Sequence, residues 1–151
     1  MSEIEMPEIE NAEVVREFCE AYNRHDVRAI MEVCADDCVA VYPTLVRHPK
    51  DVWARLLSEE VAAFPDGHLT ILSLIAQRHQ VALEFSWKAT QQGEYRGAAP
   101  TGRTFDFPCV FIFELAATRI RLAKLYWNTR LWDLHEKADQ VSGETVAVEA
   151  R

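Results

Sequence analysis

Two amide side chains stand where predicted strands end, and such groups can bind and polarise a carbonyl. Gln91 shares the strand parity of Phe85 and Trp87, so it continues an apolar strand face. Asn128 has the same relation to Tyr126 in the last strand. Small-molecule pockets are mostly apolar with a few polar groups that orient the ligand. The pattern predicts both amides in a pocket. The alternatives are a solvated Gln91 and an Asn128 that pairs with backbone.

Two further side chains offer a phenol and a carboxylate. Tyr42 ends the first predicted strand, before Pro43, and can either hydrogen-bond a substrate carbonyl or belong to the core. Asp133 is the nearest carboxylate after Asn128 and lies in a short predicted helical turn over residues 131–137. It can reach the mouth of a pocket or stay in solvent. Tyr42 and Asp133 therefore join the two amides as candidate catalytic residues.

Large apolar side chains on the third predicted helix and on the strands are candidates to line this pocket. Aromatic residues at such spacing are also typical of a plain core. The candidates for substrate binding are Trp53, Leu57, Phe85, Trp87, Phe111, Tyr126 and Trp132.

Charge and motifs exclude several other kinds of site. The formal net charge is −8, which argues against nucleic acid or an anionic membrane as partner. The sequence has no phosphate-cradling glycine loop. Its cysteines lack further ligands at zinc spacing, so we expect no metal site and interpret them as small core residues. They are Cys19, Cys34, Cys38 and Cys109.

The pattern of apolar residues also predicts a cytoplasmic protein. No run of 18 apolar residues suggests a membrane span, and the start MSEIEMPEIENAE is acidic, unlike a signal peptide. Four cysteines are compatible with a reducing compartment.

The periodicity of the sequence switches once, from helical to alternating, near residue 68. This order predicts an α+β fold with N-terminal helices on a strongly curved, mainly antiparallel sheet and a hollow between them. We divide the chain into an acidic extension (1–11), one domain (12–138) and a tail (139–151). The predicted helices are 12–24, a short one after Asp26 and one from Pro49 to Phe64; the predicted strands are 38–42, 69–75, 81–91, 104–114 and 120–129.

Four short motifs occur in an order known from one protein family. In them the sequence resembles the SnoaL-like polyketide cyclases, which have the cone-shaped nuclear transport factor 2-like, or cystatin-like, fold. The resemblance extends over residues 12–136. The motifs are AYNRHD (21–26), FPDGH (64–68), GEYRG followed by PTGR (93–103) and YWN (126–128).

The resemblance implies ring closure without a cofactor, in which an acid–base residue removes a proton next to a carbonyl. The family's acid–base residue is an Asp near the end of the last strand, and Asn128 occupies that place here. Many relatives have a His where this chain has Gln91. An amide cannot exchange a proton near neutral pH. Another titrating group must therefore serve, and Asp133 is the candidate.

The sequence thus predicts an enzyme that acts on a small apolar, aromatic or polyketide-like carbonyl compound, with aldol cyclisation as one possible reaction. A pocket that only binds such a ligand is the alternative, favoured by the two amides. A third possibility is another reaction on the same fold, such as that of an isomerase, dehydratase, hydrolase or hydroxylase.

Two strands are apolar on both parities, which predicts a homodimer through the outer sheet face. A sheet with one wet face should alternate apolar with polar residues. The helices cover one face only, so a second copy is the simplest cover for the other. The rival cover is the tail, 139–151. The residues concerned are Phe105, Phe107, Cys109, Phe111 and Phe113 against Val110 and Ile112, and Leu122 and Tyr126 against Ala123, Leu125 and Trp127.

Overall fold

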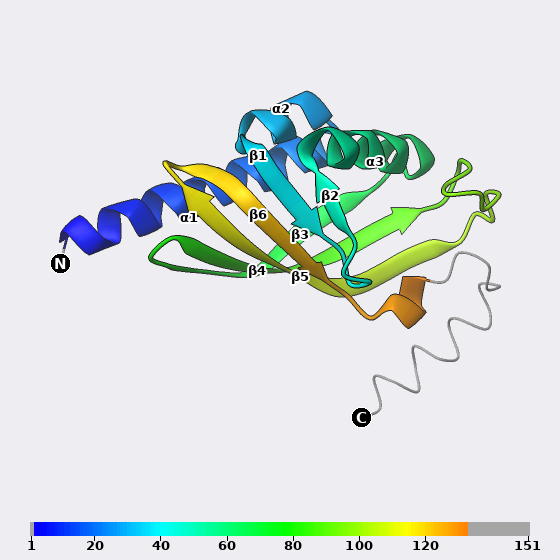
Figure 1. Ribbon diagram of the computed structural model, residues 1–151. Coiled ribbons are helices and arrows are strands. Elements are labelled where there is room, and N and C mark those ends of the chain that lie inside the picture. Colours follow the sequence, from blue (N-terminus) through cyan, green and yellow to red (C-terminus); the bar gives the residue numbers. More distant parts are fainter. Residues whose placement is uncertain (1, 133–151) are drawn as a thin grey trace.

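A computed structural model describes residues 2–132 and shows helices packed on the concave face of one curved sheet (Figure 1). The chain begins with the helices and continues with the long strands, as the switch near residue 68 predicts. The elements are α1 (Ser2–Asn23), α2 (Val27–Glu32), β1 (Cys34–Val41), β2 (Arg47–Pro49), α3 (Lys50–Ala63), β3 (His68–Gln77), β4 (Gln80–Thr90), β5 (Thr104–Ala116), β6 (Arg119–Tyr126) and the 3₁₀ turn η1 (Thr129–Trp132).

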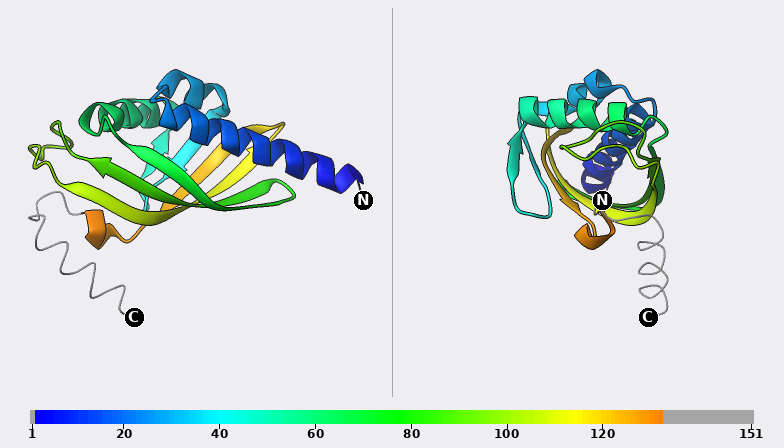
Figure 2. Two further views of the ribbon diagram at one scale, coloured as in Figure 1. Left: turned by 180° about the vertical axis from the view of Figure 1, so that it is seen from behind. Right: turned by 90° about the vertical axis from the view of Figure 1, so that its right-hand side faces the viewer.

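The six strands form one open, mainly antiparallel sheet in the order β2-β1-β6-β5-β4-β3. The pairing of β1 with β6 is parallel, and every other pairing is antiparallel. The sheet curls around the helices, and its edge strands β2 and β3 do not meet (Figure 2). The predicted α+β architecture is confirmed.

Helix α1 is longer than the segment predicted over residues 12–24. It begins at Ser2 and continues through Pro7. Its N-terminal half is tied to the β3–β4 turn, since Arg78 N donates to the Glu8 carboxylate (2.7 Å) and Asn11 Nδ2 donates to Arg78 O (3.2 Å). Its buried face carries Val15, Phe18 and Tyr22 toward the sheet.

Strict alternation on the two longest strands builds the core. On β4 the buried side chains are Val81, Leu83, Phe85, Trp87 and Ala89, which confirms the predicted inner face. Strand β5 pairs with the whole length of β4 and adds an aromatic row to the same face. That row is Phe105, Phe107, Phe111 and Phe113, with Cys109 among them.

Two sequence-based exclusions can be compared with the described part of the chain. Within residues 2–132, no helix has the length and apolarity needed to span a lipid bilayer. The same residues contain no group of three or more His, Cys, Asp or Glu side chains placed to hold a metal ion. All four cysteines are buried and free.

Candidate functional site

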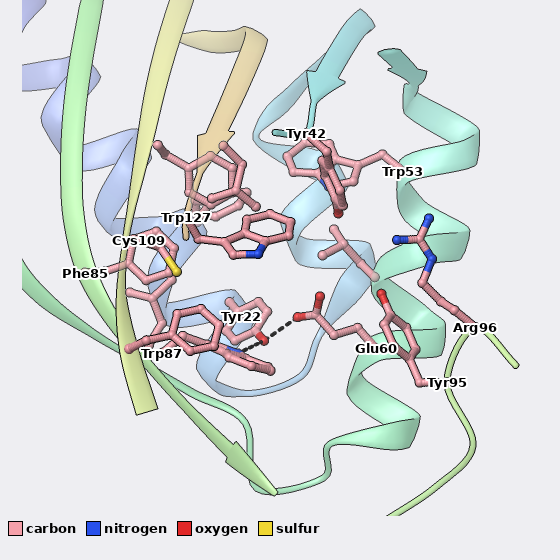
Figure 3. A pocket seen from close by; sticks show the side chains of 16 residues that line it. Tyr22, Tyr42, Trp53, Glu60, Phe85, Trp87, Tyr95, Arg96, Cys109 and Trp127 are labelled. Atoms are coloured by element: carbon pink, nitrogen blue, oxygen red, sulfur yellow. Dashed lines mark hydrogen bonds between the residues drawn. The ribbon is translucent and has the colours of Figure 1, made fainter. Parts of the chain in front are cut away.

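A pocket opens between the helices and the concave sheet face, with a free volume of about 70 Å³ (Figure 3). Ten of its sixteen lining residues are aromatic, and the two charged ones are Glu60 and Arg96. The lining comprises Phe18, Tyr22, Tyr42, Trp53, Leu57, Glu60, Leu69, Phe85, Trp87, Tyr95, Arg96, Phe107, Cys109, Phe111, Leu125 and Trp127.

Three polar groups form a hydrogen-bonded chain inside this aromatic pocket. The Trp87 indole Nε1 donates to the Tyr22 hydroxyl oxygen (2.7 Å), and the Tyr22 hydroxyl donates to Glu60 Oε2 (2.5 Å). Figure 3 shows the Glu60 carboxyl group directed from α3 toward Tyr22 on α1. The indole fixes the phenol, and the phenol fixes the carboxyl group.

Helical spacing explains why a carboxyl group faces the pocket. Trp53, Leu57 and Glu60 follow one another at steps of four and three along α3, so they share one face. Trp53 and Leu57 are buried. Glu60 is therefore carried inward with them, whereas the adjacent Glu59 is exposed.

The AYNRHD segment holds Tyr22 in place through the residues that follow it. Asn23 exchanges two hydrogen bonds with the backbone of Leu69, through its Nδ2 (2.9 Å) and its Oδ1 (2.7 Å). His25 Nε2 donates to Gly67 O (2.8 Å). Asp26 caps α2 by accepting from Ala29 N (3.0 Å). The motif therefore clamps the end of α1 to the β3 entry.

The FPDGH segment completes this clamp from the other side. The Asp66 carboxylate accepts from Thr90 N (2.7 Å), and Phe64 packs edge-on against Trp87. A Cβ atom on Gly67 would lie 3.1 Å from Phe64 O and 3.5 Å from the Tyr22 hydroxyl. Glycine here lets the turn pass close to the Tyr22 hydroxyl.

Burial sets the protonation of the pocket's acids. Desolvation raises the pKa of Glu60 above its ordinary value, while the Tyr22 hydrogen bond and the positive charges of Arg96 and His25 act in the opposite direction. Desolvation and then the Glu60 charge raise the pKa of Tyr22 well above its usual value. Glu60 thus keeps its proton to a higher pH than a solvated glutamate does, and Tyr22 remains a hydrogen-bond donor.

The other ionisable lining groups stay protonated. Burial, followed by the Glu60 charge, raises the pKa of Tyr42 and of Tyr95. Burial also raises the pKa of Cys109 to about 12, so this thiol does not supply a thiolate nucleophile near neutral pH. The two phenols are available as neutral donors to a bound oxygen.

The structure brings six of the sequence-predicted residues together in the pocket lining. One of them is Tyr42, whose ring lies edge-on to Trp127. The other five come from α3 and from strands β4 and β5. They are Trp53, Leu57, Phe85, Trp87 and Phe111.

Three other predicted residues lie outside this lining. Gln91 is fully buried, but its Nε2 donates to Gly93 O (3.2 Å) and Ala98 O (3.1 Å), so it braces the loop after β4. Tyr126 is 48% exposed. Asn128 is exposed, and its Oδ1 accepts from Arg130 N (3.1 Å) at the start of η1.

Two predictions fall outside the described residues: Asp133 and the side chain of Trp132. The sequence reasoning also missed the three polar residues that distinguish the pocket, Tyr22, Glu60 and Arg96. For Glu60 a signal was present, because a carboxylate on the same helical face as Trp53 and Leu57 is unusual.

Comparisons with known proteins agree with this architecture. A family model for SnoaL-like polyketide cyclases matches residues 12–130. The chain belongs to the SnoaL-like polyketide cyclase family. No curated protein sequence matches significantly.

Solved structures of SnoaL-like and related folds resemble the whole domain. AclR of Streptomyces galilaeus, described as a "putative hydroxylase", is 26% identical, with 83% of this chain and 93% of that chain covered and a TM-score of 0.75. A Xanthomonas campestris protein described as a "putative polyketide cyclase" is 20% identical, covers 89% and 98%, and has a TM-score of 0.77. A Catenulispora acidiphila protein with a ketosteroid isomerase-like fold, solved with trimethylamine, is 15% identical, covers 84% and 95%, and has a TM-score of 0.70.

Proposed function

We propose that this protein is a polyketide cyclase-type acid–base enzyme that acts, without a cofactor, on a small apolar or aromatic carbonyl compound. The observation that carries the proposal is the Glu60 carboxyl group, hydrogen-bonded to Tyr22 in an otherwise aromatic pocket. A carboxyl group whose pKa is raised by burial is suited to exchange protons near neutral pH.

In the proposed step the Glu60 carboxylate removes a proton from the carbon next to the substrate carbonyl. The electron pair moves onto the carbonyl oxygen and gives an enolate. Tyr42 and Tyr95 line the same pocket and supply neutral phenols that can donate to this oxygen, while the Tyr22 hydroxyl donates to Glu60. In a cyclisation, the enolate carbon then attacks a second carbonyl of the same molecule. The proton on Glu60 passes to the alkoxide that forms.

The free volume of the pocket is small in the described conformation. An engineered cavity of about 150 Å³ is known to accommodate benzene, whereas this pocket offers about 70 Å³. Lining side chains must therefore move to admit even a single ring, and they must move further for a substrate with several rings. Single-ring ketones are therefore the appropriate first probes.

Proton exchange tests the proposal without knowledge of the natural substrate. Acetophenone in D₂O exchanges its methyl protons slowly, and nuclear magnetic resonance follows the loss of the methyl signal. We expect the protein to accelerate this exchange in proportion to its concentration. Saturable binding of acetophenone with no acceleration would instead identify a binding protein, the alternative that the sequence left open.

The sequence offers a second candidate for the proton-transfer role in Asp133. The family resemblance to the segment around Asn128 supports it, whereas the hydrogen-bonded chain to Tyr22 supports Glu60. The two assignments make opposite predictions for the variants Glu60→Gln and Asp133→Asn.

A cytoplasmic location also remains a prediction from the sequence.

We also propose that the protein forms a homodimer through the outer face of its sheet. Tyr126 on β6 pairs with Val110 on β5, and Ile112 lies two residues further along. Ile75 on β3 continues this apolar group across Ala82 and is 64% exposed. Glu84 pairs with Val110 and Lys124 pairs with Ile112, so the apolar group has charged neighbours on the same face. Large exposed apolar side chains grouped in this way are uncommon on soluble monomers.

Light scattering tests the dimer directly. We expect a dimer mass at micromolar concentration and a monomer mass for Tyr126→Glu, which places a charge in the patch. The matched control is Arg121→Glu on the same strand, which changes the charge at a residue that is already polar. A monomer mass for the unmodified protein would rule out a stable dimer.

A further inference from the structure

One guanidinium group stands at the rim of the aromatic pocket. Among residues 2–132, Arg96 is the only cationic side chain in the lining, and it is exposed. It comes from the loop between β4 and β5, beside Tyr95, with the guanidinium 6.0 Å from the centre of the Tyr95 ring. In Figure 3 it lies on the same side of the pocket as Glu60 and Tyr95, opposite Trp87 and Cys109.

The backbone around Arg96 is a tight and unusual turn. Tyr95 and Ala98 exchange two backbone hydrogen bonds, of 3.0 and 2.9 Å. Both central residues are left-handed, with φ of 50° at Arg96 and 81° at Gly97. Such turns favour Asn or Gly at the first central position, because a side chain there is strained. Five other non-glycine residues of the described chain also have a positive φ, so the turn determines where Arg96 lies but does not by itself assign it a role.

Arg96 has no carboxylate to neutralise it among the described residues. The four ion pairs found between residues 2 and 132 all involve other side chains. Glu60 shares the lining, but the two are not within ion-pair distance. The Arg96 charge nevertheless lowers the pKa of Glu60, Tyr42 and Tyr95, so its field acts within the pocket.

We propose that the substrate carries a carboxylate, which Arg96 binds at the rim while the apolar part of the molecule fills the aromatic pocket beside Glu60. This inference rests on the proposed function and names its substrate class. A guanidinium binds a carboxylate through two parallel hydrogen bonds. An acid held in this way keeps its charge near water and buries only its apolar body, so it avoids the cost of burying a charge.

The geometry also excludes some ligands by charge. An amine or quaternary ammonium ion would find many aromatic faces, which favour cations, but it would have to pass Arg96. A neutral carbonyl compound would be tolerated without gaining the rim contact. The order of affinity expected from the pocket is therefore acid, then neutral amide or ester, then amine.

Calorimetric titration with matched probes tests this order. Cinnamate and cinnamamide have the same size and one ring, and they differ in charge. We expect the protein to bind cinnamate about fivefold or more tighter than cinnamamide, as a charged hydrogen bond would give. The ratio of the affinity for cinnamate to that for cinnamamide should fall toward one at about 1 M salt, where the Debye length is about 3 Å.

Variants of Arg96 locate the preference. Arg96→Gln should bind both probes equally, with cinnamamide affinity unchanged, and Arg96→Lys should keep part of the preference for the acid. The matched control is Arg78→Gln in the β3–β4 turn, since Arg78 is also exposed and has a φ of 55°. It lies at the opposite end of the sheet from the Arg96 loop and should keep the full preference (Figure 1).

Several outcomes would overturn the inference. They are equal affinity for the two probes, an acid preference that survives in Arg96→Gln, and no binding of either probe. Failure of the proposed function has a different signature, because binding does not require proton transfer. If the protein prefers cinnamate through Arg96 but does not accelerate exchange of ketone protons, the inference about the ligand class stands and the proposed enzymatic function is wrong.

Discussion

The C-terminal part of α3 and the segment after β6 offer two different places for a proton-transfer residue. After β6, where the family resemblance places an acid, the chain has Asn128, which is exposed and accepts a hydrogen bond from Arg130 N. On α3, Glu60 enters the aromatic pocket and is held by Tyr22. The comparison teaches that a proton-transfer residue can come from any element that reaches the cavity. Proton transfer depends on the burial and hydrogen-bond partners of the carboxyl group, and these differ between the two regions.

The largest effect expected from this comparison is the loss of exchange activity in Glu60→Gln. Glutamine keeps the size and the hydrogen bond to Tyr22 but cannot take up a proton. Removal of a general base should lower the rate of acetophenone exchange by about 10² to 10⁴. Nuclear magnetic resonance in D₂O measures it.

The matched control for this variant is Glu59→Gln, which changes the same residue type one position away on the exposed face of α3. Its exchange rate should equal that of the unmodified protein. If both variants keep full activity, Glu60 is not the base, and the comparison between the two regions turns in favour of the segment after β6.

A smaller effect is expected for Tyr22→Phe, which removes one hydrogen bond and leaves the ring. The exchange rate at the pH optimum should fall by about tenfold, the value of a hydrogen bond to a charged group. Tyr22 also lowers the pKa of Glu60. Without it that pKa rises, so the pH at which activity reaches half of its plateau should increase. A rate–pH curve measures both effects.

The shape of that curve follows from the direction of the Glu60 shift. The base must be ionised, so activity is low in acid and rises with pH through the raised pKa of Glu60. Tyr42→Phe serves as the control, since it also removes a pocket phenol but not the Glu60 hydrogen bond. A midpoint that is the same in Tyr22→Phe and in Tyr42→Phe would argue against coupling between Tyr22 and the base.

A stability effect should accompany the loss of activity in Glu60→Gln. The folded-state pKa of Glu60 lies above its ordinary value of 4.5. The folded protein therefore holds a proton that the unfolded chain releases, and stability falls as pH rises through this window. Glutamine has no such charge to bury. We expect the variant to have the higher Tm at pH 7 and the difference to shrink near pH 4, as measured by calorimetry.

This test separates a functional carboxyl group from a structural one. If Glu60 stabilised the fold, the Glu60→Gln variant would be less stable than the unmodified protein at neutral pH. If Glu60 is a catalytic group whose burial lowers the stability of the fold, the variant is more stable. A lower Tm for Glu60→Gln than for Glu59→Gln at pH 7 would contradict the interpretation.

Much of the fold could be predicted from periodicity, including the short helix after Asp26, but the start of β1 and the strand β2 could not. The change of period near residue 68 marks the beginning of β3, the first of the four consecutive strands β3–β6. Strand β1 begins at Cys34, four residues before the predicted start. The prediction missed these residues because Asp36 and Asp37 interrupt the apolar run and a bulge follows Cys34. Strand β2 has three residues and ends in proline, so it gives no alternating signal.

The apolar lining could be predicted better than the polar groups in it. Strand parity determines which face a residue joins, and it identified Phe85, Trp87 and Phe111. Parity also agrees with the burial of Gln91, but it does not specify what a side chain contacts where a strand ends. β4 ends at Thr90, so the Gln91 side chain turns into its own loop. Helical spacing places Glu60 on the face of Trp53 and Leu57, but its hydrogen bond to Tyr22 depends on how α3 packs beside α1, which the periodicity of one helix does not specify.

The smallest effect in the comparison is expected for Asn128→Ala. The Asn128 side chain bonds to Arg130 N and lies outside the pocket lining, so its loss should change the exchange rate by less than about threefold, within the range of an exposed substitution. Asn128→Asp should likewise add no activity, because its carboxylate would remain at the start of η1.

Asp133→Asn, measured beside the two Asn128 variants, is expected to retain activity if Glu60 is the base. A loss of about 10² in Asp133→Asn with an active Glu60→Gln would return the role to the segment after β6. Equal and partial losses in both variants would mean that the two carboxyl groups share the proton, since neither alone would then account for catalysis.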